Sequence, residues 1–203
     1  MSGVDEAVEA LGAGKPVVLP FDTVYGLAAE PYRDESARRL YLLKGRAETQ
    51  PSALVASDLE FLFECLPELR GRAGSLARLL LPGPVTLVVP NPARRFRWIT
   101  GTNQEAIGVR VPELEGPGAD VLVRVGAVVA TSANRPGEPD PSRLEDVPED
   151  LRAGAAAVVD GGELPGTAST VIDLTSPEPR ILREGALPGY EALGRLASAV
   201  RSS

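Results

Sequence analysis

The sequence predicts an α/β fold with a buried sheet. Short apolar segments alternate along the chain with longer segments whose apolar residues recur at helical spacing. The apolar segments are nearly continuous, which is typical of strands that are covered on both faces. No segment repeats, and no linker or change of composition divides the chain, so we expect residues 1–203 to form a single domain.

The N-terminal part predicts a helix, one or two strands and a second helix. Residues 4–13 have an amphipathic helical pattern, and the apolar residues 16–20 follow as a strand. Residues 22–27 then form a turn or a second strand. A helix is expected over residues 34–44, because Asp34 is a good N-terminal cap and Gly45 is a typical stop.

The next part predicts a strand and two helices. Residues 53–56 are apolar and form a strand. Ser57 and Glu60 have the spacing of a capping box, so we expect a helix to begin there. Another helix is expected from about residue 67 to residue 80, where a Pro-Gly-Pro sequence ends it.

The remaining chain continues the alternation to the C-terminus. The apolar segments predict strands, and two segments with helical periodicity predict helices. The expected strands are 85–89, 107–111, 127–131, 158–160, 169–174 and 180–182, and the expected helices are 142–152 and 190–200.

The composition excludes several kinds of catalysis. The chain contains no histidine, which removes Ser-His-Asp and Cys-His catalysis and almost every histidine-bearing zinc site. Its single cysteine, Cys65, cannot form a thiolate metal cluster. Phosphate chemistry fits the remaining side chains best, because it depends on positioning and on neutralisation of charge. The net charge of −7 argues against bulk nucleic acid as the main partner.

The sequence also predicts a cytoplasmic protein. No apolar run approaches the roughly 18 residues that a membrane span needs. The first residues, MSGVDEAVEA, are acidic and lack the pattern of a signal peptide. A single cysteine cannot stabilise the fold by an internal disulfide, which suits a reducing compartment.

The segment Gly12-Ala13-Gly14-Lys15 resembles a phosphate-binding loop only superficially. Pro16 follows the lysine where such a loop has Ser or Thr. The segment also precedes a predicted strand, whereas a phosphate loop follows one. We therefore expect a helix C-terminus and an exposed lysine.

Polar residues gather where the predicted strands end, which is where ligands bind in open α/β sheets. Each has an alternative structural role: Lys44 can complement a helix dipole, Arg110 can be ion-paired, and Asn134 can shape a turn. Together they indicate an anion pocket, and by themselves they predict no more than an enzyme that acts on a phosphate ligand. These residues are Thr23, Tyr25, Lys44, Arg46, Arg110, Ser132, Asn134 and Arg183.

Residues 94–98 (RRFRW) are basic and contain two aromatic side chains. Such a segment can stack on the bases of RNA. The alternative, which we favour, is a solvated loop that Trp98 anchors to the protein.

Seven motifs occur in a fixed order over nearly the whole chain. In this order they resemble the family called YrdC or Sua5, the threonylcarbamoyl-AMP synthases. A single motif such as K-x-R is not specific, but seven collinear motifs are. They are PFDTVYGL at 20–27, KGR at 44–46, PGPVT at 82–86, RVP at 110–112, SANRPG at 132–137, STVID at 169–173 and REG at 183–185.

The resemblance implies a YrdC-like fold. That fold is a twisted, open, mostly parallel or mixed α/β sheet flanked by helices, with a large concave basic cleft. The motifs span about residues 16–187, and residues 188–203 are expected to form a closing helix. The chain ends soon after REG, so it resembles the short form of the family.

The resemblance also implies a reaction. L-threonine, bicarbonate and ATP give threonylcarbamoyl-AMP and pyrophosphate, the first step of threonylcarbamoyladenosine formation at position 37 of tRNA. ATP is then a substrate and Mg²⁺ accompanies it, with no fixed metal site on the protein. The implied partners are the transferase machinery that receives the adenylate, by transient contact, and weakly bound RNA.

The matching motifs imply roles for individual residues. Lys44 and Arg46 are expected to be catalytic and to hold bicarbonate or carbamate and phosphate oxygens. The expected nucleotide site adds Ser132, Asn134 and Arg183 to this pair. The expected threonine site consists of Thr23, Arg110, which binds the carboxylate, and Ser169, with Tyr25 as part of its wall.

Three residues depart from the family pattern. Phe21 stands where relatives usually have a threonine, which removes a hydroxyl from the mouth of the pocket. Val55 stands where some relatives have a histidine. Asp140 stands where relatives often have a small residue, and an acid beside phosphates is unfavourable unless it meets Mg²⁺ or faces away.

Three other functions remain open at this point. One is a noncatalytic RNA-binding or ribosome-assembly protein. Another is a carbamoyl-transfer domain like that of hydrogenase maturation factors. The third is a paralogue that adenylates a different carbamate, for which Phe21 is the main argument.

Overall fold

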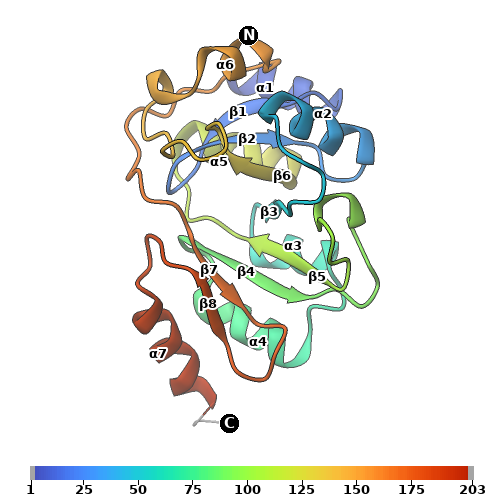
Figure 1. Ribbon diagram of the computed structural model, residues 1–203, viewed down its shortest axis with the longest axis vertical. Helices are drawn as coiled ribbons and strands as arrows, with labels where there is room; N and C mark the ends of the chain where they lie inside the picture. The colour runs from blue at the N-terminus through green and yellow to red at the C-terminus, as the bar shows by residue number, and fades with distance from the viewer. Residues whose placement is uncertain (1–2, 201–203) are drawn as a thin grey trace.

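The computed structural model describes residues 3–200, which form one eight-stranded sheet with helices on both faces (Figure 1). The strand order is β1-β2-β6-β3-β5-β4-β7-β8. The strands are β1 (Val17–Pro20), β2 (Tyr25–Ala29), β3 (Ala53–Ala56), β4 (Val85–Pro90), β5 (Ala106–Arg110), β6 (Ala127–Ser132), β7 (Thr170–Asp173) and β8 (Arg180–Arg183). The helices are α1 (Gly3–Gly12), α2 (Asp34–Lys44), α3 (Leu59–Cys65), α4 (Gly71–Leu80), α5 (Gly116–Val125), α6 (Glu149–Gly154) and α7 (Gly189–Val200).

The sheet is mixed, which confirms one of the two expected arrangements and excludes the mostly parallel one. Only β3–β5 and β4–β7 pair in parallel, while every other neighbouring pair is antiparallel. The reason lies in the connections. Residues 21–24 join β1 to β2 and residues 174–179 join β7 to β8, and connections this short allow only hairpins, because a parallel pair needs a longer crossover.

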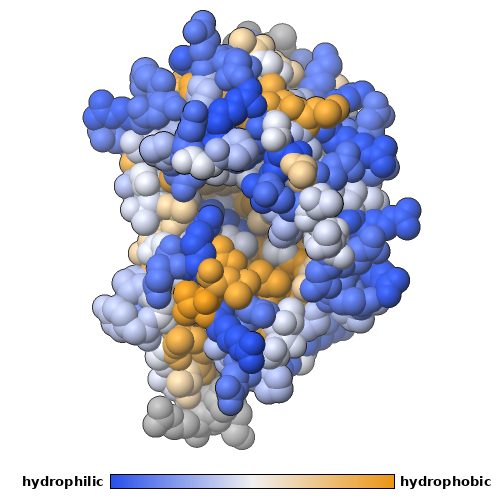
Figure 2. Space-filling view, viewed as in Figure 1, coloured by the Kyte–Doolittle hydropathy of each residue, from blue (hydrophilic) through white to orange (hydrophobic). Residues whose placement is uncertain are grey.

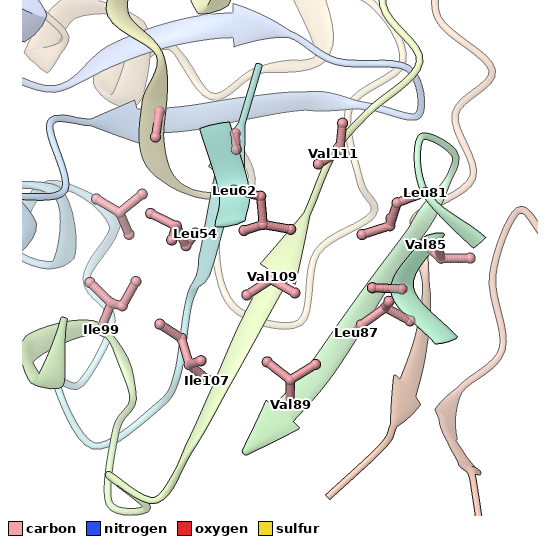
Figure 3. Close-up of a cluster of buried hydrophobic side chains, with 14 of the residues drawn as sticks. Leu54, Leu62, Leu81, Val85, Leu87, Val89, Ile99, Ile107, Val109 and Val111 are labelled. Atoms are coloured by element: carbon pink, nitrogen blue, oxygen red, sulfur yellow. The ribbon is translucent and has the colours of Figure 1, made fainter. Parts of the chain in front are cut away.

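One face of the sheet carries most of the apolar core. Figure 3 shows Leu54, Leu87 and Val109 from three strands meeting Leu62 of α3, and all four side chains are fully buried. Burial of each such side chain stabilises the fold by about 1.5–3 kcal/mol. Helices α2, α4, α6 and α7 contribute to the same cluster.

The opposite face is covered over only part of its width. A second apolar cluster joins α1 and α5 to β1, β2, β3 and β6. Among residues 3–200, no member of this cluster comes from β4, β5, β7 or β8. The sheet therefore leaves an uncovered surface beside α5, on the face that carries the even-numbered residues of β2, β5 and β6.

Most of the predicted elements are confirmed, and the clearest case is α2. It covers residues 34–44 as expected, and Gly45 ends it in the left-handed region at φ 68°. The N-cap residue, however, is Arg33, and Asp34, expected to be the cap, is the first helical residue. The expected closing helix is confirmed as α7, and residues 201–203 lie outside the described part of the chain. No helix within residues 3–200 has the length and apolar character needed to cross a membrane.

Two predicted helix starts are wrong. Asp58, not Ser57, caps α3, because its carboxylate accepts the Phe61 backbone N–H at 2.8 Å. Helix α4 begins at Gly71 instead of residue 67. In both cases the helix begins later in the sequence than expected.

Two further expectations fail between residues 142 and 160, and one helix was missed. The helix expected over 142–152 is divided into a short 3₁₀ turn, Leu144–Asp146, and α6, because Pro148 stands between them. The strand expected over 158–160 contributes only a single bridge, from Val158 to Val18. Helix α5 was not predicted, because two glycines and a proline in its first turn hide the apolar positions that follow.

Candidate functional site

A cavity of about 450 Å³ lies on the partly uncovered face of the sheet. Figure 2 shows this face of the molecule hollowed beside an apolar patch. Strand residues alternate between the two faces, so one set of alternate residues forms the cavity floor. Several members of this set are glycine or alanine, which leaves room for a ligand. They are Gly26, Ala53, Ala106, Gly108 and Ala130.

Position 26 of this floor has no room for a side chain, because the ring of Phe21 lies against it. A Cβ atom at this position would lie 2.6 Å from the ring of Phe21, closer than side chains pack. The ring of Phe21 therefore rests on the glycine, and it lines the cavity with Val55. Phe21 and Val55, two of the three departures from the family pattern, thus face the cavity and make this part of it apolar.

A buried ion pair lies at one end of the cavity. The Arg110 guanidinium bonds to the Asp22 carboxylate and donates to the Thr23 hydroxyl at 2.8 Å. The other Asp22 oxygen accepts the Glu113 backbone N–H at 3.2 Å. Burial raises the pKa of Asp22 and lowers the pKa of Arg110, and each charge opposes the shift of its partner. We take the pair to be ionised, since these hydrogen bonds favour the charged forms.

A second polar group joins β4, β7 and β8. Arg183 donates to the Ser169 carbonyl oxygen at 2.8 Å and to the Ser169 hydroxyl at 3.1 Å. That hydroxyl lies 2.9 Å from the Thr86 hydroxyl. Arg183 is exposed and belongs to the edge strand, so the rest of its guanidinium remains open to a ligand.

Lys44 lies behind the wall of the cavity. Its ammonium group is within hydrogen-bonding distance of Thr131 Oγ1 (3.2 Å), Asn134 Oδ1 (3.1 Å) and both oxygens of Ser132. The side chain is almost fully buried and does not line the cavity. Burial, followed by the charge of Arg46, lowers the pKa of Lys44 to about 8.

Arg46 is arranged differently, although it is only two residues away. Its guanidinium lines the cavity and donates to the Pro51 carbonyl oxygen at 2.6 Å, but its Nε atom is buried without a partner. The buried hydroxyls of Tyr41 and Ser52 are close enough for Ser52 to influence the pKa of Tyr41, but neither makes a hydrogen bond. Burial lowers the pKa of Arg46, and the nearby charge of Arg183 adds to this effect.

The structure brings six of the nine expected site residues to the cavity and places three elsewhere. Lys44 and Asn134 lie behind it. Tyr25 was expected to form part of its wall, but the side chain points away: its hydroxyl lies 3.0 Å from Asp160 Oδ1 and accepts the Gly161 N–H at 3.0 Å. The six that line the cavity are Thr23, Arg46, Arg110, Ser132, Ser169 and Arg183.

Several polar residues of the site were not expected from the sequence. Asp22 and Thr86 belong to motifs that were recognised, but no role was assigned to them. Ser52, Thr100 and Asn103 also line the cavity. For Thr86 the signal was present, because it alternates with Val88 along β4 on the face of the cavity.

The described residues provide no protein metal site. No three His, Cys, Asp or Glu side chains among residues 3–200 come together as a ligand group. Of the residues that the structure describes, Asp140 alone lines the cavity with a carboxylate. One carboxylate suits Mg²⁺ that arrives on a nucleotide, because Mg²⁺ in such sites takes most of its ligands from phosphates and water.

The basic aromatic segment at residues 94–98 is engaged within the protein. Arg94 pairs with Glu105, and Arg95 pairs with Glu68. The Trp98 indole donates to the Pro31 carbonyl oxygen at 2.8 Å. These contacts confirm the expectation of a loop anchored by its tryptophan, and they leave few groups for RNA.

Comparison with known proteins gives one consistent result. Residues 9–185 match the family model Sua5_yciO_yrdC, which is described as "Telomere recombination". A threonylcarbamoyl-AMP synthase of Pyrococcus abyssi is 36% identical over 176 residues, or 86% of this chain and 52% of that protein. A threonylcarbamoyl-AMP synthase of Pseudomonas syringae is 30% identical over 186 residues, with 90% and 97% covered. The chain thus spans about half the length of the Pyrococcus protein and almost all of the Pseudomonas one.

Solved structures have the same fold. The P. abyssi Sua5 structure complexed with L-threonine matches with a TM-score of 0.86 and 34% identity, over 95% of this chain and 56% of that one. The E. coli YciO structure matches with a TM-score of 0.81 over 94% and 92% of the two chains. Its identity of 24% supports the fold alone.

Proposed function

Since the chain belongs to the Sua5/YciO/YrdC family, we propose that it is a threonylcarbamoyl-AMP synthase. The enzyme joins L-threonine, bicarbonate and ATP and releases pyrophosphate, and it thereby takes the first step toward threonylcarbamoyladenosine at position 37 of tRNA. The relatives with this name cover most of the chain at 30–36% identity, which supports the proposal. The P. abyssi Sua5 structure complexed with L-threonine supports threonine as the amine substrate.

One observation carries the proposal: three guanidinium groups and only one carboxylate line a single cavity. The two groups that react, the carbamate and the triphosphate of ATP, are both anionic. An enzyme for this reaction must therefore screen their repulsion. Arginine suits this task, since it stays charged and can bind two oxygens of a carboxylate or a phosphate.

We assign threonine to the end of the cavity that holds Arg110. Its carboxylate pairs with Arg110, while the hydroxyls of Thr23 and Ser169 accept or donate hydrogen bonds beside it. The Asp22 carboxylate already accepts a hydrogen bond from one nitrogen of the Arg110 guanidinium, so the substrate carboxylate pairs with the remaining N–H groups. Phe21 and Val55 form an apolar wall, which suits the methyl group of threonine.

The nucleotide is assigned to Arg46, Ser132 and Arg183. Arg183 is close enough to Arg46 for its positive charge to lower the pKa of Arg46. Two like charges in proximity favour an anion between them, and a triphosphate supplies it. Lys44 and Asn134 are not included in this contact set, because neither side chain lines the cavity.

The chemistry requires no histidine. The amine nitrogen of threonine bonds to the carbon of CO₂ and loses a proton, or bonds to the carbon of bicarbonate as a C–O bond breaks and water leaves, and either route gives a carbamate. A carbamate oxygen then bonds to the α-phosphorus of ATP, and the bond from that phosphorus to the pyrophosphate oxygen breaks. The arginines hold the two anions in line, which lowers the barrier by positioning and by charge neutralisation. Mg²⁺ on the phosphates supplies further positive charge when it is bound, and Asp140 is the residue that could hold it.

The proposal extends to a cellular setting. The adenylate is the substrate of a separate transferase that acts on tRNA, so the protein contacts that machinery transiently, and any contact with RNA is weak. This setting is the cytoplasm. A paralogue that uses another amine is the second candidate, and the observation in its favour is that Phe21 lines the cavity.

The decisive measurement is pyrophosphate release from ATP and Mg²⁺, with threonine and bicarbonate each present or omitted. We expect release only when both are present. If ATP binds but no combination gives release, the enzyme uses another amine, and a panel of amino acids identifies it. If ATP does not bind, the enzyme proposal is wrong and an RNA-binding role takes its place.

A further inference from the structure

Lys44 and Arg46 project to opposite sides of the residue between them. Helix α2 ends at Lys44, and Gly45 adopts a left-handed conformation with φ 68°. This turn directs Lys44 toward the end of β6 and Arg46 into the cavity. A Cβ atom at position 45 would be strained by the positive φ and would approach an Arg135 nitrogen to 3.3 Å.

The hydrogen-bonding capacity of Lys44 is already used within the protein. An ammonium group has three hydrogens, and four oxygens from β6 and the following turn surround it. The residue is only 2% exposed. A ligand in the cavity thus finds neither a free N–H group nor an open path to this side chain.

Asn134 completes the same network. Its side-chain oxygen accepts from Lys44 at 3.1 Å and from the Ser132 hydroxyl at 2.6 Å, while its amide nitrogen donates to the Glu138 carbonyl oxygen at 2.6 Å. The network fixes the turn that follows β6. Ser132 and Asp140, at the two ends of this turn, both line the cavity.

We propose that Lys44 is a positioning residue that holds Ser132 and the turn to Asp140 in place, and that within Lys44-Gly45-Arg46 only Arg46 contacts the ligand. The functional part of this inference rests on the proposed synthase activity. The geometric part does not, because it concerns the network in the protein without a ligand.

Two charged groups affect Lys44 besides its oxygen partners. Arg46 opposes its positive charge and Asp140 favours it, while burial opposes it most strongly. All of these groups belong to the site, so the protonation of Lys44 depends on the same loop that it holds. The charged form is needed to supply three hydrogen bonds, whereas a neutral amine supplies two.

The first test uses the fact that the chain has only two lysines, Lys15 and Lys44. Lys15 is exposed and serves as the internal control. The protein is treated with a limiting amount of an amine-acetylating reagent, with and without ATP, and modified peptides are measured by mass spectrometry. We expect Lys15 to be acetylated and Lys44 to stay unmodified in both conditions. Rapid modification of Lys44 that ATP suppresses would show a ligand contact and overturn the inference, as would rapid modification in both conditions.

The second test is a double-mutant cycle on pyrophosphate release, with Lys44→Met, Asn134→Ala, their combination, and Lys15→Met as control. If both residues act through one network, each single change lowers kcat/KM by roughly tenfold and the combination is no worse than Lys44→Met alone. Losses that multiply would mean that Lys44 acts on the ligand independently, which overturns the proposal. If the unmodified enzyme releases no pyrophosphate, the synthase proposal fails, while the acetylation result still decides the placement of Lys44.

Discussion

The two sides of the cavity differ in how their polar groups are satisfied. On one side, Lys44 and Asn134 form a closed network behind Ser132, and Arg110 is paired with Asp22. On the other side, Arg46 and the hydroxyls of Tyr41 and Ser52 have buried polar atoms without a hydrogen bond, as does the Nε atom of Arg110 beyond its pair with Asp22. We call the first set, Lys44, Asn134, Asp22 and Arg110, the bonded side, and the second set, Arg46 with Tyr41 and Ser52, the unpartnered side.

This difference indicates which groups are built for folding and which are built for binding. A buried polar group without a partner destabilises the protein by about 1–3 kcal/mol, so it is retained where a ligand supplies the missing partner. A closed network instead holds its members in one geometry before the ligand arrives. We therefore expect Lys44, Asn134 and Asp22 to shape the cavity, and the unpartnered side, together with the remaining N–H groups of Arg110, to recognise what enters it.

The largest effect is expected from breaking the ion pair of the bonded side. Arg110→Met leaves the Asp22 carboxylate buried without its partner, so we expect the free energy of unfolding to fall by about 3–5 kcal/mol, as measured by urea denaturation. The double change Asp22→Leu with Arg110→Met removes both charges and should recover most of the loss. A stability of the single variant equal to that of the unmodified protein would show that the pair is not a structural feature.

The next effect belongs to the unpartnered side. Arg46→Ala removes a charged group that we assign to the nucleotide, so kcat/KM for pyrophosphate release should fall by roughly ten- to a hundredfold, while the unfolding midpoint changes little. Arg97→Ala, at an exposed arginine outside the cavity, is the control. Full activity of the Arg46 variant would remove this residue from the nucleotide site.

Local signals in the sequence were sufficient for α2 but not for α5 or for the direction of the strands. Gly45 could be recognised as the end of α2, because a left-handed stop follows from glycine itself. Helix α5 begins with Gly116, Pro117 and Gly118, and the low helix propensity of glycine and proline argues against a helix at this point of the sequence. Strand direction depends on which strands become neighbours, and β3 pairs with β5 across two intervening helices and β4, a relation that no local pattern contains.

The candidate site shows the same limit. The resemblance named nine site residues, and six of them line the cavity. It did not predict that Asp22 binds Arg110 or that Lys44 is enclosed by β6, since these partners are 88 residues apart in the sequence. The orientation of Tyr25 was missed for a related reason, because its partner loop at 160–162 is 135 residues or more away.

A matched pair of small changes sharpens the comparison between the two sides. Asn134→Ala opens the closed network and should lower the free energy of unfolding by about 1–3 kcal/mol. Ser52→Ala removes a buried hydroxyl that has no partner, so it should leave the stability unchanged or raise it by up to about 1 kcal/mol. Chemical denaturation measures both. Equal destabilisation by the two changes would contradict the division into a bonded and an unpartnered side.

The pH dependence of Lys44 has a sign that separates activity from stability. The folded protein releases the Lys44 proton at about pH 8, whereas the unfolded chain releases it near 10.5. Between these values the unfolded state binds more protons, so the contribution of Lys44 to stability rises with pH. Activity should fall over the same window, because the neutral amine no longer supplies three hydrogen bonds to the Ser132 turn. Lys44→Met should abolish the rise in stability, while Lys15→Met should leave it intact. Parallel loss of activity and stability above pH 8 would instead mean that the enzyme unfolds there, and that the charge of Lys44 is not what holds the site.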